Sequence, residues 1–244
     1  MALPKISYPT FTVKLPSNGR KITFRPFLVK EEKILLFAKE SGEQEDIYDA
    51  ITQIINNCVV DDDFDVNKVA TFDLEYIFIQ LRSKSVGNII VATIKDAEDG
   101  KEHKVEVDLE KVTIESYEGA EKDNVIQLGD QNGTIFKLKY PSSRDLIDAA
   151  KNAKGEKAPD LVLNLARVCI TAIGDNDPDH VYVWEDNTDE EKLAFLEQIN
   201  GEAYSKMSEF FSDMPSLKHE VFYKNSLGHE RSVVFRSLDD FFQF

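Results

Sequence analysis

The sequence predicts an α+β fold, and two observations carry this prediction. Apolar residues recur with the 3.6-residue period of a helix across residues 29–84. From about residue 88 to residue 141 the period changes to two, in short runs interrupted by Asp99-Gly100 and Asn132-Gly133, which is typical of antiparallel strands joined by turns. We therefore expect an N-terminal β-hairpin with a helical cluster, a central antiparallel sheet, and C-terminal helices closed by a β-hairpin. The corresponding regions are residues 1–87, 88–152 and 153–244.

The N-terminal region begins with a predicted hairpin. Apolar side chains alternate over residues 11–15 and again over residues 22–24, and Asn18-Gly19 lies between the two runs. A tight hairpin turn needs positive φ, which Asn and Gly tolerate, so this pair indicates the turn. Three helices are expected next, over residues 29–39, 45–59 and 67–84. Their apolar stripes predict one buried cluster, formed by Ile51, Ile54, Ile55, Cys58, Phe72, Leu74, Ile77, Phe78 and Leu81.

The C-terminal region is expected to be mainly helical. Thr188 and Glu191 have the spacing of a capping box, in which each residue satisfies a backbone amide of the other. The polar segment 151–160 is the expected internal boundary. Two strands around a turn at residues 225–228, followed by an amphipathic turn, close the chain. The remaining expected elements are helices over residues 143–152, 160–173, 189–199 and 201–211, and a short strand over residues 180–185.

The composition limits the classes of partner. Acidic residues outnumber basic ones 45 to 29, which gives a formal net charge of −16 at pH 7. Nucleic acids and anionic membranes attract basic surfaces, so this charge argues against both. The charge serves either solubility or contact with basic patches on protein partners. We find no signal peptide pattern and no run of about 18 apolar residues, so we expect a cytoplasmic protein in which Cys58 and Cys169 are buried free thiols.

Sequence motifs for catalysis and metal binding are absent. The chain has no phosphate-binding glycine loop, no G-x-S-x-G motif and no H-E-x-x-H motif. His219 and His229 could face each other across the terminal hairpin, but a metal site would need two more ligands, and only Glu220 and Glu230 lie beside them. The acidic loops at residues 61–65 and 175–179 have the alternating aspartates of a calcium loop without its glycine, and helix capping explains them better. We expect no enzyme activity, no cofactor and no metal; a well-formed apolar pocket with convergent polar groups would reopen the enzyme alternative.

Three segments carry a resemblance to a known family. They are L-P-S-N-G at residues 15–19, R-P-F-L-V-K-E-E-K at residues 25–33, and F-D-L-E-Y-I-F-I-Q-L-R-S-K-S-V-G at residues 72–87. With Met214-Pro215 and the final Asp240-Phe241-Phe242, the chain resembles the T4-like bacteriophage baseplate hub subunit and baseplate hub assembly catalyst family. This resemblance implies a structural subunit in the hub region of a contractile tail baseplate. Such a subunit acts through protein–protein interactions in tail assembly.

The resemblance also implies partners and a location. The partners would be other baseplate or tail proteins, in a hetero-oligomer. Assembly would take place in the host cytoplasm, and a retained subunit would remain in the tail baseplate of the virion. The alternative is a chaperone-like hub assembly factor that is absent from the mature virion.

The matching segments also indicate where a partner would bind. The expected contact residues are Arg25, Phe27, Leu28, Lys30, Lys33, Arg82, Lys84 and Ser85. The charged members of this set are cations on an acidic protein. In such an interface, exposed charges set the association rate and the orientation of the partner, and apolar side chains supply the affinity. The alternative is structural: Arg25 sets how the chain enters the first helix, and Arg82 and Lys84 are ordinary cations at the end of a helix.

Overall fold

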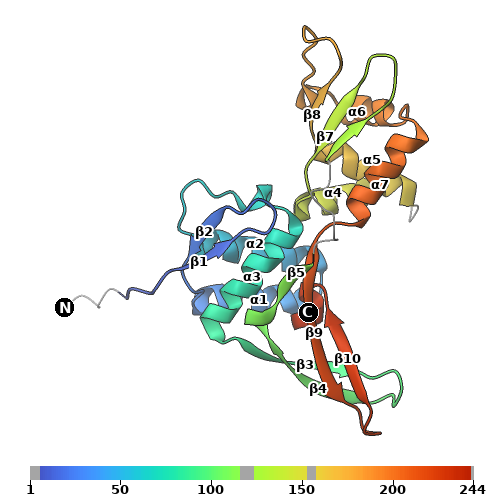
Figure 1. Ribbon diagram of the computed structural model, residues 1–244. Coiled ribbons are helices and arrows are strands. Elements are labelled where there is room, and N and C mark those ends of the chain that lie inside the picture. Colours follow the sequence, from blue (N-terminus) through green and yellow to red (C-terminus); the bar gives the residue numbers. More distant parts are fainter. Residues whose placement is uncertain (1–5, 116–123, 153–157, 243–244) are drawn as a thin grey trace, which may run out of the picture. The chain divides into compact units, whose positions relative to one another are not determined.

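The computed structural model describes residues 6–115, 124–152 and 158–242. Within these ranges the chain has the predicted α+β fold, with helices and small antiparallel sheets (Figure 1). It divides into two compact units, of which unit 1 combines Met1–Glu115 with Ser216–Phe244 and unit 2 is Ser116–Pro215. The units cut across the three expected regions, because the terminal hairpin joins the N-terminal helices. The boundary expected at residues 151–160 falls largely in residues 153–157, outside the described ranges.

Unit 1 begins with the predicted hairpin. Strand β1 (Phe11–Lys14) pairs with β2 (Lys21–Phe24) in antiparallel register. The Leu15 amide still donates to the Arg20 carbonyl at 2.8 Å, so the connection is wider than a two-residue turn, and Gly19 supplies its positive φ of 72°.

The three predicted helices follow the hairpin. They are α1 (Val29–Ser41), α2 (Gln44–Cys58) and α3 (Thr71–Val86). A short 3-10 turn, η1 (Val66–Lys68), precedes α3, and the Asp65 side chain caps it by accepting from the Asn67 amide at 3.1 Å. The acidic loop at residues 61–65 thus contains the helix cap that the sequence suggests.

The remaining elements of unit 1 are strands and short helical turns. They are β3 (Ile89–Lys95), β4 (Glu102–Asp108), η2 (Leu109–Lys111), β5 (Thr113–Glu115), β9 (Ser216–Lys224), β10 (Glu230–Phe235) and α8 (Leu238–Phe242). The β3–β4 hairpin lies beside the β9–β10 hairpin (Figure 1), and their tips are joined by hydrogen bonds. The Tyr223 hydroxyl donates to Asp96 at 2.5 Å, and the Ser226 amide and hydroxyl both donate to Asp99 at 2.9 Å.

Unit 2 is inserted between two paired strands of unit 1. Glu115, the last residue of β5, is opposite Ser216, the first residue of β9. The Lys218 ammonium and the Arg236 guanidinium both bind the Glu115 carboxylate. The two points at which the chain leaves and re-enters unit 1 are therefore neighbours in one antiparallel pair.

The described part of unit 2 combines a three-stranded antiparallel sheet with four helices. The sheet has β7 (Ile135–Leu138) between β6 (Val125–Gln127) and β8 (Ile170–Gly174). The helices are α4 (Ser143–Asn152), α5 (Ala158–Cys169), α6 (Asp189–Leu196) and α7 (Gly201–Ser212), with a 3-10 turn, η3 (Trp184–Asp186), before α6. The predicted capping box is present, since the Thr188 amide donates to Glu191 at 2.8 Å and the Glu191 amide donates to Thr188 at 3.3 Å.

Long-range pairing changes three of the expected elements. The strands between residues 88 and 141 are antiparallel but belong to three separate sheets instead of one central sheet. The helix expected over residues 160–173 ends at Cys169, because the following residues pair with β7 as strand β8. The strand expected over residues 180–185 makes an isolated bridge between Tyr182 and Ile173 and continues as η3.

The predicted cluster of helical side chains is confirmed for eight of its nine residues, which belong to the core of unit 1. Phe72, the ninth, is buried but is not part of this cluster. Ile55, Cys58, Ile77, Phe78 and Leu81 have no exposed surface. The cluster extends to the inward face of the β1–β2 hairpin, including Ile22 and Phe24. Unit 2 has a separate core, which contains the tryptophan. None of the helices in the described ranges is long and apolar enough to cross a bilayer.

Candidate functional site

A buried ion pair holds the junction between the hairpin and α1. The Arg25 guanidinium donates to the Glu31 carboxylate at 2.8 Å and to the Asn57 carbonyl oxygen at 2.9 Å. The Glu31 side chain is fully buried, and its second oxygen accepts from the Leu28 amide at 2.9 Å. Burial alone would raise the pKa of Glu31, but the hydrogen bonds from Arg25 and Leu28 outweigh burial and lower this pKa. Glu31 therefore caps its own helix as a carboxylate, and Arg25 balances the charge.

The other matching segments are also bonded to one another. The Ser17 amide donates to the Asp73 carboxylate at 3.0 Å, and the Ser17 hydroxyl binds the same carboxylate. The Phe27 amide donates to the Ser85 hydroxyl at 2.9 Å, and that hydroxyl donates to the Leu81 carbonyl oxygen at 2.5 Å. Contacts between the three segments thus fix the hairpin loop to the start of α3, and the entrance of α1 to the end of α3.

The structure joins the two expected contact segments but leaves only part of them accessible. Phe27 is buried, and Arg25 and Ser85 use their polar groups inside unit 1. Leu28 and Arg82 are partly buried. Lys30, Lys33 and Lys84 are exposed. The Lys84 ammonium binds Glu110 at 2.6 Å. Phe27 is thus unavailable as an apolar contact, because it packs into the core of unit 1.

Helix α1 carries an exposed apolar face next to these lysines. Val29, Leu36 and Phe37 are 68%, 56% and 69% exposed. Together with Lys33 they follow the spacing i, i+4, i+7 and i+8, which places all four on one side of a helix. The opposite side of α1, which includes Ala38, packs on the core. We call the set Val29, Lys33, Leu36 and Phe37 the outer face of α1.

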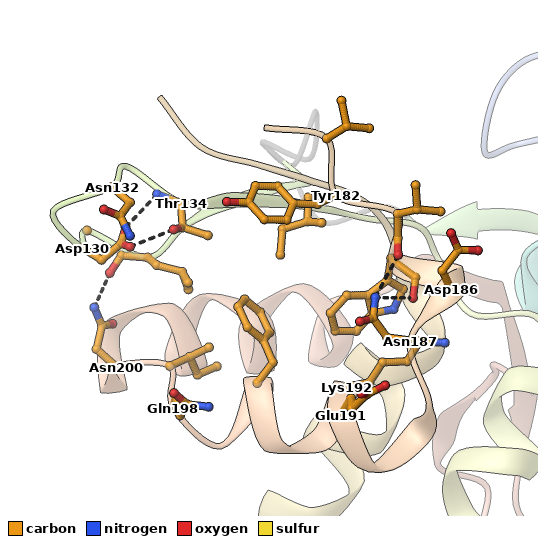
Figure 2. A pocket seen from close by; sticks show the side chains of 18 residues that line it. Asp130, Asn132, Thr134, Tyr182, Asp186, Asn187, Glu191, Lys192, Gln198 and Asn200 are labelled. Carbon is orange, nitrogen blue, oxygen red and sulfur yellow. Dashed lines mark hydrogen bonds between the residues drawn. The ribbon is translucent and has the colours of Figure 1, made fainter. Parts of the chain in front are cut away.

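Unit 2 contains a groove of about 780 Å³. It lies between the β6–β7 turn, the segment 181–187 and α6 with the residues that follow it. Figure 2 shows Asp130, Thr134 and Tyr182 on one side of the groove, opposite Glu191 and Gln198. The apolar part of the lining consists of Leu128, Ile173, Trp184, Phe195 and Ile199, with Val181 and Val183 at the edge.

A buried arginine holds the base of the groove. The Arg167 guanidinium donates to Asp189 at 2.6 Å and also binds Asp148, so it connects α5 to α6 and α4. Burial alone would lower the pKa of Arg167, but these two carboxylates outweigh burial and raise it. The Trp184 indole nitrogen donates to the Arg167 carbonyl oxygen at 3.0 Å, and its ring meets Phe195 edge to face at 5.8 Å. The aromatic floor therefore has a fixed position.

The groove offers binding contacts of three kinds. Its apolar floor can take an apolar side chain, Asn and Gln side chains supply hydrogen bonds, and Asp130, Asp186 and Glu191 supply negative charge. Asp130 accepts from the Thr134 amide and from the Thr134 hydroxyl, both at 2.7 Å. The lining residues include no serine, cysteine or histidine. The carboxylates of the groove and Lys192 are side chains that can also transfer protons, so this groove is the kind of pocket that keeps the enzyme alternative open.

The two histidines that could have faced each other across the terminal hairpin lie apart. His219 is opposite Phe235 in the β9–β10 ladder, whereas the His229 ring binds Glu98 at 2.8 Å. Among the residues that the structure describes, no group of three or more His, Cys, Asp or Glu is placed to hold a metal ion.

Comparison with known proteins identifies the family. The chain matches the model of a family described as T4 bacteriophage base plate protein, over residues 8–243. The chain belongs to this family. Searches of curated proteins and of solved structures gave no match. The match confirms the resemblance of the N-terminal segments to baseplate proteins, and it extends that relationship through unit 2 to the terminal hairpin.

Sequence reasoning missed the groove and the buried charges. The groove combines segments near residues 130, 182 and 195, which no local pattern connects. Residues 181–184 read V-Y-V-W, which is typical of a buried strand and conceals their position at the edge of a groove. The sequence did contain a local signal for the role of Glu31. This residue stands three positions after Leu28, and at that spacing a glutamate side chain can accept from the backbone amide of the N-cap residue.

Proposed function

We propose that this baseplate-family protein is a structural subunit in the hub region of a contractile tail baseplate. It acts through contacts with other baseplate or tail proteins and performs no catalysis. The family match over nearly the whole chain supports the baseplate role. The observation that supports action through protein contacts is the outer face of α1.

The outer face of α1 has the composition of a binding surface. Three large apolar side chains, each more than half exposed, occupy about two turns of one helix. Exposed apolar patches on a soluble protein mark contact sites, because burying them in a partner removes their unfavourable contact with water. Contacts between the matching sequence segments fix the end of α1 that carries Val29, so the face is presented on a preorganised element.

The charges on α1 indicate the chemistry of its partner. Lys33 lies within the face, and Lys30 stands beside it with a side chain that is 68% exposed. Glu32 and Glu40 are exposed on the same side of α1, so a partner surface with apolar side chains inside a rim of mixed charge would match the face. Two copies of this chain would each bring a net charge of −16 and would repel each other, so we assign the face to a different baseplate or tail protein.

A complementation experiment tests this proposal. In a phage whose own copy is deleted, the double substitution Leu36→Glu with Phe37→Glu should abolish assembly of complete baseplates while the purified variant remains folded. The matched control is Val60→Glu with Leu161→Glu, which changes two other exposed apolar positions and adds the same charge. The control should support assembly. Normal baseplates with the α1 variant would exclude this face, and normal baseplates without any copy would exclude the proposed function.

A further inference from the structure

We propose that the groove of unit 2 binds an extended segment of a partner protein in which an apolar side chain is flanked by lysine or arginine. This inference concerns a second surface and does not depend on the role assigned to α1. It rests on the shape of the groove, its exposed apolar edge and its charge.

The apolar edge of the groove is unusually exposed. Val181, Tyr182 and Val183 are consecutive, and they are 84%, 46% and 45% exposed. The Tyr182 hydroxyl donates to Asp175 at 2.7 Å, so the ring is held in place although one side of it faces the groove. Burying these side chains and the aromatic floor under an apolar side chain would be favourable by about 25 cal/mol for each Å² removed from water.

The backbone beside the groove suits an extended ligand. Residues 181–183 have a strand-like sequence but join β8 only through the isolated bridge between Tyr182 and Ile173. They therefore form a strip at the margin of the sheet, and an incoming extended segment commonly aligns along such a strip. The Val183 carbonyl oxygen, at the end of this strip, already accepts from the Asn187 side chain at 2.8 Å and from the Asp186 amide at 3.3 Å, so the ligand does not pair with that group.

The charge of the groove selects a basic ligand. Its charged side chains are Asp130, Asp186 and Glu191 against the single lysine Lys192. The Lys192 ammonium lies over the Trp184 ring, 5.9 Å from the ring centroid. The surrounding segment, residues 175–213, contains 12 acidic residues and two lysines. Hydrogen bonds from Thr134 lower the pKa of Asp130, which keeps its charge on the rim. Lysine or arginine beside the apolar anchor would meet this rim.

Three labelled heptapeptides test the proposal against the full-length chain by fluorescence anisotropy. The first probe is Lys-Lys-Leu-Phe-Leu-Lys-Lys, the second replaces its lysines by glutamates, and the third replaces Leu-Phe-Leu by Ser-Gly-Ser. We expect the first probe to bind and the other two to bind at least about tenfold more weakly, a difference of about 1.4 kcal/mol. Equal binding of the first and third probes would show general attraction to an acidic protein and would overturn the proposal.

Two charge reversals locate the binding. Asp186→Lys changes the groove, whereas Glu197→Lys makes the same charge change at an exposed position outside the lining. Asp186→Lys should weaken the first probe about five- to tenfold, and Glu197→Lys less than about twofold, because the effect of an exposed charge decreases with distance. A third variant, Val183→Ser, should also weaken it. Equal effects of the two reversals, or no effect of Val183→Ser, would contradict binding in the groove. Circular dichroism and Trp184 fluorescence confirm that each variant is folded.

Discussion

The substitution Arg25→Ala tests whether the charges at the start of α1 are structural. It would leave the Glu31 carboxylate fully buried, with the Leu28 amide at 2.9 Å and the partly solvated Lys30 ammonium at 3.3 Å as its remaining partners. Removing one member of a buried ion pair typically costs about 3–5 kcal/mol, because the other charge stays desolvated. We expect a loss of about 3 kcal/mol in the free energy of unfolding, since two partners of Glu31 remain. This is a large part of the ~5–15 kcal/mol available to a domain.

Arg20→Ala provides the matched control. The Arg20 guanidinium binds Asp63 at 2.7 Å, but the Asp63 side chain is 82% exposed, so we expect a loss below about 1 kcal/mol. Urea unfolding followed by circular dichroism measures both variants. Trp184, the one tryptophan of the sequence, lies in unit 2, and its fluorescence follows the unfolding of that unit. The urea midpoint of this fluorescence transition should be the same in both variants as in the wild type. Adding Glu31→Gln to Arg25→Ala should restore part of the stability. If Arg25→Ala costs no more than Arg20→Ala, the ion pair does not hold this junction.

Three further predictions concern unit 1. Phe78→Ala should lower the free energy of unfolding by about 3–5 kcal/mol in urea titrations, whereas Phe222→Ala, at a position 75% exposed, should change it by less than about 0.5 kcal/mol. Burial raises the pKa of Glu75 to about 7, so between about pH 4.5 and 7 the folded chain keeps a proton that the unfolded chain has released. The free energy of unfolding therefore decreases as pH rises from about 4.5 through 7. Glu75→Gln should thus be more stable than wild type by about 3 kcal/mol at pH 8 and nearly equal at pH 4, in urea titrations at both values. Replacing residues 116–215 by a short glycine–serine turn should leave unit 1 folded, with cooperative thermal unfolding, because Glu115 and Ser216 are already paired.

The parts of the fold that the sequence predicts are those determined by local periodicity. The helix pattern gives α2 and α3 within a few residues, and the nine predicted core residues are all buried, because an amphipathic stripe leaves one way to bury it. The pairing of strands is not local. The segment that becomes β8 reads as the end of a helix, and its pairing with β7, more than 30 residues earlier, decides its conformation. The insertion of unit 2 between β5 and β9 is hidden for the same reason.

The geometry of the candidate site could not be predicted from the sequence. The resemblance identifies the segments at residues 25–33 and 72–87, but it does not predict the hydrogen bond between Phe27 and Ser85 that joins them. The sequence does not show that Arg25 turns inward to Glu31, because a charged residue near a hairpin is usually solvated. Nor does it show that Leu36 and Phe37 are exposed, since their spacing from Val29 could equally face a core. Only the packing of Ala38 and its neighbours onto α2 determines which side of α1 remains open.

Quantitative mass spectrometry of purified virions is the most direct test of the proposed subunit role. Particles of the encoding phage, separated from free protein on a density gradient, should contain this chain in a fixed ratio to the other baseplate proteins. The ratio should not change on repeated purification. Absence of the chain from infectious particles, combined with failed baseplate assembly when its gene is deleted, would contradict a structural subunit and would indicate an assembly factor that leaves before the virion is complete.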